Sequence, residues 1–114
     1  MNERVYQHLA DDVFRRIARA FDQLDPDQVD CEVAGDVVTL VFSGGPSGRA
    51  LRCVLNTQRP TRQIWLAAGA HAWHFSYDLP NEVWVDDKGR GELFSVLAAL
   101  VREHAGVELP LGRP

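Results

Sequence analysis

Hydrophobic residues recur at helical spacing along the first part of the chain. They return every three or four positions, at Val5, Leu9, Val13, Ile17, Phe21 and Leu24, with Tyr6 and Phe14 alongside. This spacing places them on one face of a helix, with charged residues on the opposite face. Pro26 limits the helix at its C-terminal end, because the residue before a proline is disfavoured in the α region. The pattern therefore predicts an amphipathic helix that ends before Pro26.

From Val29 the period changes to two, which is the spacing of a β-strand. In the segment VDCEV, the side chains of Val29, Cys31 and Val33 alternate with two acidic ones, so one face of this strand should be apolar. The turn AGD and the β-branched run VVTLVF follow. Further short strands are predicted at RALRCVLN, RQIWLA, AWHFSY and EVWV. The run ELFSVLAALVREH then returns to helical spacing, and Gly106 ends it.

The order of the predicted elements is helix, five or six strands, helix. The connections between the strands are too short for parallel crossovers, so the sheet should be mainly antiparallel. Each helix has a single apolar stripe, and the two helices would cover one face of the sheet. The predicted fold class is therefore α+β, a two-layer sandwich that forms a single domain over residues 1–114. Its other sheet face stays open to solvent or to a partner.

Charge and composition argue against several classes of protein. The 114 residues carry a net charge of −4, whereas a nucleic-acid-binding protein would have a basic face. No apolar run approaches the length of a membrane span, and the N-terminus has no apolar signal-peptide core. We therefore expect a cytoplasmic protein. Cys31 and Cys53 lack CxxC spacing and alternate with core-facing residues, so we expect two buried, reduced thiols.

Acidic side chains gather in one segment, DQLDPDQVDCE. It carries no Lys or Arg, and its acids are Asp22, Asp25, Asp27, Asp30 and Glu32. The first two lie at the end of the predicted helix, where the helix dipole disfavours carboxylates, so a bound cation would be stabilising. Carboxylate oxygen suits iron and other hard cations, but no preorganised cage of ligands is evident, so binding should be weak. The alternative is an acidic surface covered only by water.

A tryptophan is predicted on the open face of the sheet. In RQIWLA the apolar residues should point towards the helices, which turns Trp65 the other way. Three polar residues are expected beside it: Asn56, Gln58 and Gln63. An aromatic anchor with a polar rim is typical of a protein-contact site. The alternative is that Trp65 packs beneath a neighbouring side chain.

Other arrangements of reactive residues are weaker. His71 and His74 are three apart in a predicted turn and strand, so their side chains should lie on opposite sides and not share a zinc ion. His74 should face the open side of the sheet. No Ser/His/Asp or Cys/His arrangement and no phosphate-binding glycine loop can be argued from the sequence. We therefore predict no enzymatic activity.

One motif resembles the signature strand pair of a known family. It reads Asn56-x-Gln58-x-Pro60-x-x-Gln63-Ile64-Trp65-Leu66-Ala67. This motif is similar to that of the frataxin family, bacterial CyaY type. The resemblance covers nearly the whole chain, and its further matches are Leu9-Ala10-Asp11, Asp30-Cys31-Glu32, His74-Phe75, Trp84 and the closing leucine-rich helix.

The resemblance implies a function and its partners. Members of this family are αβ-sandwich proteins that bind iron weakly, as Fe²⁺ or Fe³⁺, and serve iron–sulfur cluster assembly. They contact the cysteine desulfurase and the scaffold protein, as iron donors or as regulators of the desulfurase. Carried over to this chain, the iron site comprises Asp22, Asp25, Asp27, Asp30 and Glu32, and the partner site comprises Asn56, Gln58, Gln63 and Trp65. Other divalent cations are further candidate ligands, and a monomer is expected, with iron-driven oligomers left open.

A second hypothesis uses the same residues without iron. In it the chain is an adaptor whose acidic ridge, formed by the first helix and the first strand, docks on an arginine-rich patch of the desulfurase. Trp65 anchors another contact. The chain also departs from the family pattern near the end of the first helix. Relatives carry acids where this chain has Ala18 and Arg19, and Arg15 and Arg16 lie one turn earlier. These arginines should weaken cation binding on the helix and concentrate it on residues 22–32.

Overall fold

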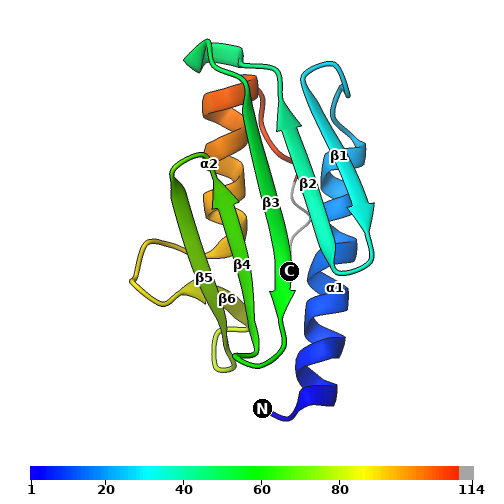
Figure 1. Cartoon of the computed structure of the whole chain (residues 1–114), viewed down its shortest axis with the longest axis vertical. Coiled ribbons are helices and arrows are strands. Elements are labelled where there is room, and N and C mark those ends of the chain that lie inside the picture. The colour runs from blue at the N-terminus through cyan, green and yellow to red at the C-terminus, as the bar shows by residue number, and fades with distance from the viewer. Residues whose placement is uncertain (111–114) are drawn as a thin grey trace.

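The computed structural model describes residues 1–110 and contains two helices and six strands. The elements in chain order are α1 (Glu3–Asp22), β1 (Val29–Ala34), β2 (Val37–Phe42), the 3-10 turn η1 (Gly45–Ser47), β3 (Leu51–Gln58), β4 (Gln63–Ala68), β5 (His71–Asp78), β6 (Val83–Asp86) and α2 (Leu93–Ala105). The strands form one sheet in the order β1-β2-β3-β4-β5-β6, and every neighbouring pair is antiparallel (Figure 1). The predicted α+β fold class is confirmed.

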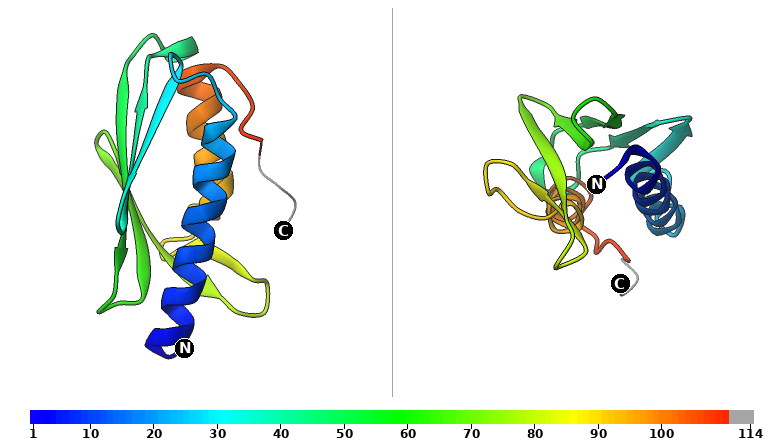
Figure 2. Two further views of the ribbon diagram at one scale, coloured as in Figure 1. Left: turned by 90° about the vertical axis from the view of Figure 1, so that its right-hand side faces the viewer. Right: turned by 90° about the horizontal axis from the view of Figure 1, so that it is seen from below.

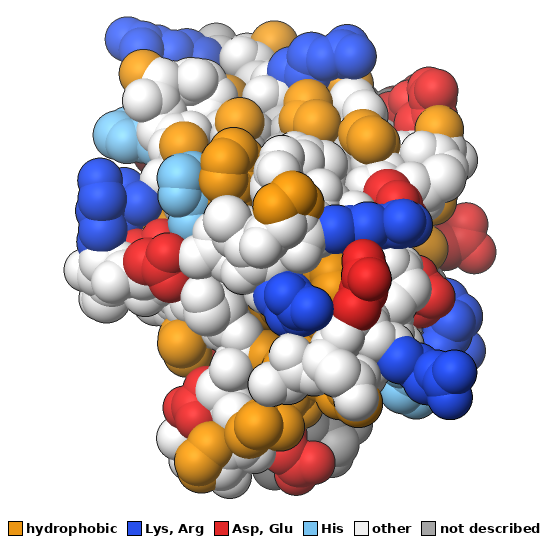
Figure 3. All heavy atoms as spheres, turned by 60° about the horizontal axis from the view of Figure 1, so that its bottom comes forward, with side chains coloured by type: hydrophobic (Ala, Val, Ile, Leu, Met, Phe, Trp, Pro, Cys, Tyr) orange, Lys and Arg blue, Asp and Glu red, His pale blue; other side chains and the backbone are white. Residues whose placement is uncertain are grey.

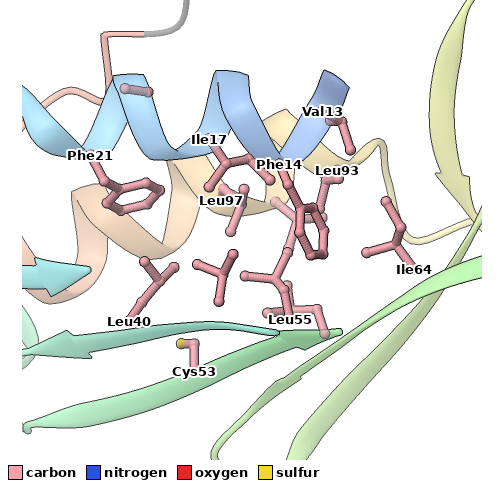
Figure 4. Close-up of a cluster of buried hydrophobic side chains, with 14 of the residues drawn as sticks. Val13, Phe14, Ile17, Phe21, Leu40, Cys53, Leu55, Ile64, Leu93 and Leu97 are labelled. Atoms are coloured by element: carbon pink, nitrogen blue, oxygen red, sulfur yellow. The ribbon is translucent and has the colours of Figure 1, made fainter. Parts of the chain in front are cut away.

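Both helices pack on the same face of the sheet, which leaves the other face open (Figure 2). The core lies between these two layers, where helix side chains such as Ile17, Phe21 and Leu97 meet strand side chains such as Leu40 and Leu55 (Figure 4). A buried hydrogen bond also joins the layers, since the Tyr6 hydroxyl donates to the Gln63 backbone oxygen at 2.7 Å. The apolar face predicted for the sheet is therefore the one that the helices cover.

The buried stripe of α1 differs in part from the predicted one. Val13, Ile17 and Phe21 are buried as expected, and so are Tyr6 and Phe14 beside them, but Ala10 is also buried while Leu9 is only half-buried. Val5 is 42% exposed. An α-helix has 3.6 residues per turn, so residues spaced by four do not stay on one face. A stripe that runs through Val5, Leu9 and Val13 therefore winds away from the side of the helix that faces the sheet. α1 also ends at Asp22, earlier than the predicted apolar repeat.

The first strand is less covered than its alternation suggests. Val29 is buried, but Cys31 is half-buried and Val33 is 50% exposed. β1 is an edge strand with only one neighbour, so its far side lacks the packing that an inner strand receives. The prediction of two buried thiols is therefore correct for Cys53, which is fully buried, and wrong for Cys31. Burial raises the pKa of Cys53 to about 12.

The short turn η1 sits against the C-terminal end of α2. Gly45 has φ 48°, and a Cβ placed there would lie 2.6 Å from the backbone carbonyl carbon of His104. The Ser47 hydroxyl is 2.9 Å from His104 Nδ1, but it also donates to the Gly44 oxygen at 2.8 Å and accepts from the Arg49 amide. Ser47 thus contacts both the turn and the end of α2 and helps to hold them together.

A buried carboxylate holds the loop between β6 and α2. Asp86 accepts hydrogen bonds from the backbone amides of His74, Lys88 and Arg90 and pairs with the Arg90 guanidinium at 2.9 Å. Burial alone would raise the pKa of this carboxyl, but these hydrogen bonds and the Arg90 charge outweigh it and hold the pKa at about 2.

Within residues 1–110, no helix combines the length and the apolar character needed to cross a membrane.

Candidate functional site

The acidic segment, defined as Asp22, Asp25, Asp27, Asp30 and Glu32, runs from the end of α1 into β1. Asp22 is the last residue of the helix. Asp25 organises the turn that follows: its side chain accepts from the Asp27 amide at 2.9 Å, and its backbone oxygen accepts from Gln28 and Val29. All five acids are exposed. Within residues 1–110 none of them forms an ion pair, whereas nearby Asp36 pairs with Arg59 at 3.3 Å.

The carboxylates of the acidic segment do not all lie in the same layer of the sandwich. Asp30 and Glu32 pair across the sheet with Val41 and Thr39, so their side chains point to the open face of the sheet. Asp22 lies on the helix layer. In the part of the chain that the structure describes, no three His, Cys, Asp or Glu residues are grouped so as to hold a metal ion. The segment is thus a region of concentrated negative charge, and a cation held there would keep most of its water ligands.

A groove at the sheet edge lies between α1 and β1, and we call it the edge groove. Its volume is about 480 Å³, and residues of the helix, the following turn and the strand line it, among them Arg19, Asp22, Asp30, Cys31 and Val33. Burial, Asp30 and Asp22 together raise the pKa of the Cys31 thiol. The thiol is therefore protonated at neutral pH, which makes it a poor nucleophile and a poor metal ligand.

Arg15, Arg16 and Arg19 of α1 have different surroundings. Arg15 pairs with Asp12 at 3.7 Å on the exposed side of the helix. Arg16 lies over the Phe94 ring, 4.6 Å from its centroid. Only Arg19 lines the edge groove. The expected weakening of cation binding by these arginines stays a prediction.

Trp65 lies on the open face of the sheet, as the alternation of β4 predicts. Its neighbours in the strand, Ile64 and Leu66, are buried under the helices. The Trp65 ring stacks on the ring of His74, with 4.1 Å between centroids and 14° between planes, and its Nε1 donates to Gln63 Oε1 at 2.9 Å. His71 pairs with Ala68 on the other side of β5, so the two histidines point apart as expected. Trp65 is half-buried and held in one orientation.

Gln63 turns its side chain to the open face of the sheet, as the alternation of β4 predicts, but the residue is only 9% exposed. Besides holding Trp65, its Nε2 donates to Ser76 Oγ at 3.1 Å and to the carboxylate of Asp87. Ser76 Oγ in turn donates to Asp87 at 2.9 Å. Buried amides need such partners, and the network makes Gln63 a support for Trp65.

Ser76 and Asp87 were not among the predicted site residues. Ser76 lies on the same strand face as His74, so the alternation of β5 carries a signal for it. Asp87 lies in the loop after β6, where no periodicity operates. Its place beside Gln63 follows from the pairing of β4, β5 and β6.

Neutral side chains cover most of the open face around Trp65. Asn56 pairs with Trp65 across the sheet and Gln58 pairs with Gln63; both are half-buried. Val37 and Val41 add exposed apolar area on β2, at 38% and 40%. Figure 3 shows hydrophobic side chains in several places between charged ones on the side of the molecule that it presents. The open face around Trp65 has the mixed polar and apolar composition of a protein-contact site.

Comparisons with known proteins point in one direction. The family model described as a frataxin-like domain matches residues 1–107. The protein named iron-sulfur cluster assembly protein CyaY of Albidiferax ferrireducens is 32% identical over 97% of this chain and 98% of its own. Its namesake from Pseudomonas fluorescens is 32% identical over 95% and 93%, and that from Delftia acidovorans is 38% identical over 80% and 76%.

A solved structure has the same fold. The frataxin from Psychromonas ingrahamii superimposes with a TM-score of 0.84 and 25% sequence identity, over 99% of this chain and 100% of that one.

Proposed function

The chain belongs to the frataxin family, and on this basis we propose that it is a non-enzymatic, cytoplasmic protein of iron–sulfur cluster assembly. The proposal has two parts. The acidic segment binds iron weakly, and the open face around Trp65 docks on the cysteine desulfurase and scaffold complex. Together they would deliver iron to that complex or regulate it.

The observation that carries the iron part is the set of five exposed carboxylates without ion-pair partners in residues 1–110. Two like charges about 6 Å apart repel by roughly 0.7 kcal/mol in a water-like medium, so such a set gains from a nearby cation. Oxygen ligands suit iron as a cargo ion. An open arrangement that leaves the ion largely hydrated supports weak binding and ready release.

A second candidate is an iron-independent adaptor, and the lack of a grouped ligand set among residues 1–110 favours it. In this case the acidic segment docks directly on an arginine-rich patch of the desulfurase. Exposed charges of this kind steer association and set its salt dependence more than its strength. Both candidates share the Trp65 contact, so only the role of the carboxylates separates them.

The test of iron binding is an anaerobic titration with Fe²⁺ followed by amide NMR. Shifts and line broadening should localise to residues 22–36, and a variant with Asp25→Asn, Asp27→Asn, Asp30→Asn and Glu32→Gln should lose them. A matched control is Asp11→Asn with Asp12→Asn, which removes acids from the exposed side of α1. Signals that respond first around His71 and His74 would contradict the site assignment.

A turnover assay with desulfurase and scaffold separates the two candidates. If iron delivery is the role, the effect of this protein on turnover should require iron and vanish in the four-residue variant. An effect that persists in metal-free buffer, and that the variant still loses, would support the adaptor instead. An effect that the variant retains in both buffers would contradict both candidates.

A further inference from the structure

We propose that the free edge of β1 accepts an extended, basic segment of a partner protein as a seventh strand. Among residues 1–110 the sheet ends at β1, whose one neighbour is β2. β-strand addition to such an edge is a general recognition mode in which backbone hydrogen bonds supply affinity and alternate side chains supply specificity. The proposal shares Asp30 and Glu32 with the iron site but does not rest on it.

The register of the β1–β2 pair identifies the free backbone groups. The Ser43 amide donates to the Gln28 oxygen at 3.0 Å, so the hydrogen-bonded pairs alternate from there along the ladder. Asp30, Glu32 and Ala34 then bond to β2, while Cys31 and Val33 direct their N–H and C=O groups outward. The Val29 amide is already used by Asp25. A new strand would therefore pair at Cys31 and Val33.

The edge groove provides room for the side chains of that strand. It runs beside β1 and is lined mostly by apolar side chains of α1, the turn and the strand: Ala18, Phe21, Leu24, Pro26, Val29 and Val33. Val33 is 50% exposed there, and burying it would add favourable apolar contact. Arg19 on the rim disfavours a basic side chain in the groove itself, so the residues that point into it should be small and apolar.

On the open face of the sheet, the charges of β1 determine which side chains the added strand should carry. Asp30 and Glu32 point to the open face from β1, and further acids flank the edge. A second copy of this chain pairing through β1 would bring acids beside acids, which is destabilising. Lys or Arg at alternate positions would instead face Asp30 and Glu32. The favoured occupant is an extended segment that alternates basic and small apolar residues.

The experiment uses a capped peptide of alternating Lys and Val, added to the whole protein in buffer with EDTA. Binding should shift the Cys31 and Val33 amides, slow their hydrogen exchange at least about tenfold, and give intermolecular NOEs between the peptide backbone and β1. A peptide of alternating Glu and Val should not bind. Because the buffer is metal-free, the outcome is independent of iron binding.

Two variants test the backbone and charge parts separately. Val33→Pro removes an outward N–H without breaking the bonds to β2 and should weaken binding at least about tenfold, while Val33→Thr keeps the N–H and should bind as the wild type does. Asp30→Asn with Glu32→Gln should weaken binding several-fold and flatten its salt dependence.

Shifts centred on Trp65, or no binding at all, would overturn the proposal. The NOEs on the wild-type protein decide the question even if Val33→Pro fails to fold.

Discussion

At the scale of single residues, Asp86 couples stability to pH. Its carboxyl has a pKa of about 2 in the folded protein against an ordinary value of 3.8, and its side chain is 1% exposed. A depressed folded pKa stabilises above the unfolded value, and the stabilisation is lost as the pH falls through the folded value. A carboxyl whose pKa falls from 3.8 to about 2 on folding contributes about 2–3 kcal/mol at neutral pH.

We therefore expect Asp86→Asn to lower the free energy of unfolding by about 2–3 kcal/mol at neutral pH. The gap to the wild type should narrow as the pH is lowered from about 4 to about 2. Urea unfolding at a series of pH values measures this. The control is Asp27→Asn at an exposed position, which should change little. A gap that stays constant down to pH 2 would contradict the role of the ionised Asp86.

Gln63 holds the Trp65 side chain through a hydrogen bond, so a change at position 63 should also be felt at Trp65. In Gln63→Met the side-chain volume is nearly kept, the Tyr6 bond to the backbone oxygen remains, and the bonds to Trp65 and Asp87 are lost. The free energy of unfolding should fall by about 1–3 kcal/mol. The Trp65 indole N–H resonance should shift and exchange faster with solvent, which NMR measures directly. An unchanged indole resonance would show that Trp65 does not depend on Gln63.

At the scale of elements, the packing of η1 against α2 requires glycine at position 45. Gly45 and Gly48 both have positive φ, 48° and 70°, but only at Gly45 would a Cβ meet backbone of α2. Alanine in this region costs about 1–2 kcal/mol at either site. The additional contact should make Gly45→Ala about 2 kcal/mol more destabilising than Gly48→Ala. Equal urea midpoints for the two variants would contradict a close η1–α2 contact in solution.

At the scale of the whole molecule, the strand carboxylates and Trp65 lie on the same side of the sheet. Glu32 on β1 lies three strands from β4 and level with Ala67, two residues from Trp65. The strand spacing and the rise per residue then place the two positions about 16 Å apart, so one partner surface of ordinary size covers both. Groups this far apart usually act additively. Neutralising the carboxylates and truncating Trp65 should therefore each weaken binding of the same partner, and the two losses in binding free energy should add.

Trp65→Ala should reduce binding to the desulfurase–scaffold complex at least about tenfold and leave the Fe²⁺-induced shifts of residues 22–36 unchanged. Its cost in unfolding free energy should be about 1–3 kcal/mol, since the stack on His74 and one hydrogen bond are lost. Trp65→Phe keeps the ring and should retain most binding. Calorimetry and the iron titration check the two parts, and unimpaired binding of Trp65→Ala would contradict the docking role.

The sequence by itself determined the order of the elements and the two faces of the sheet. Helical and strand periods are properties of the local chain, so they predicted the helices at both ends, the strand of Val37–Phe42 and the outward turn of Trp65 and His74. The acidic segment was likewise visible as composition. Local patterns suffice for these features because each depends on residues that are close in sequence.

Only the tertiary structure decided how deeply each position is buried and which residues meet. Alternation could not distinguish Cys31 from Cys53, because one lies on an edge strand and the other between two strands. It could not place Gln63 among Ser76 and Asp87, which are brought together by the pairing of three strands. The edge groove beside β1 likewise exists only because α1 packs next to the edge strand of the sheet. Burial and long-range hydrogen bonding depend on neighbours far apart in the chain, and those neighbours are set by the packing of the layers.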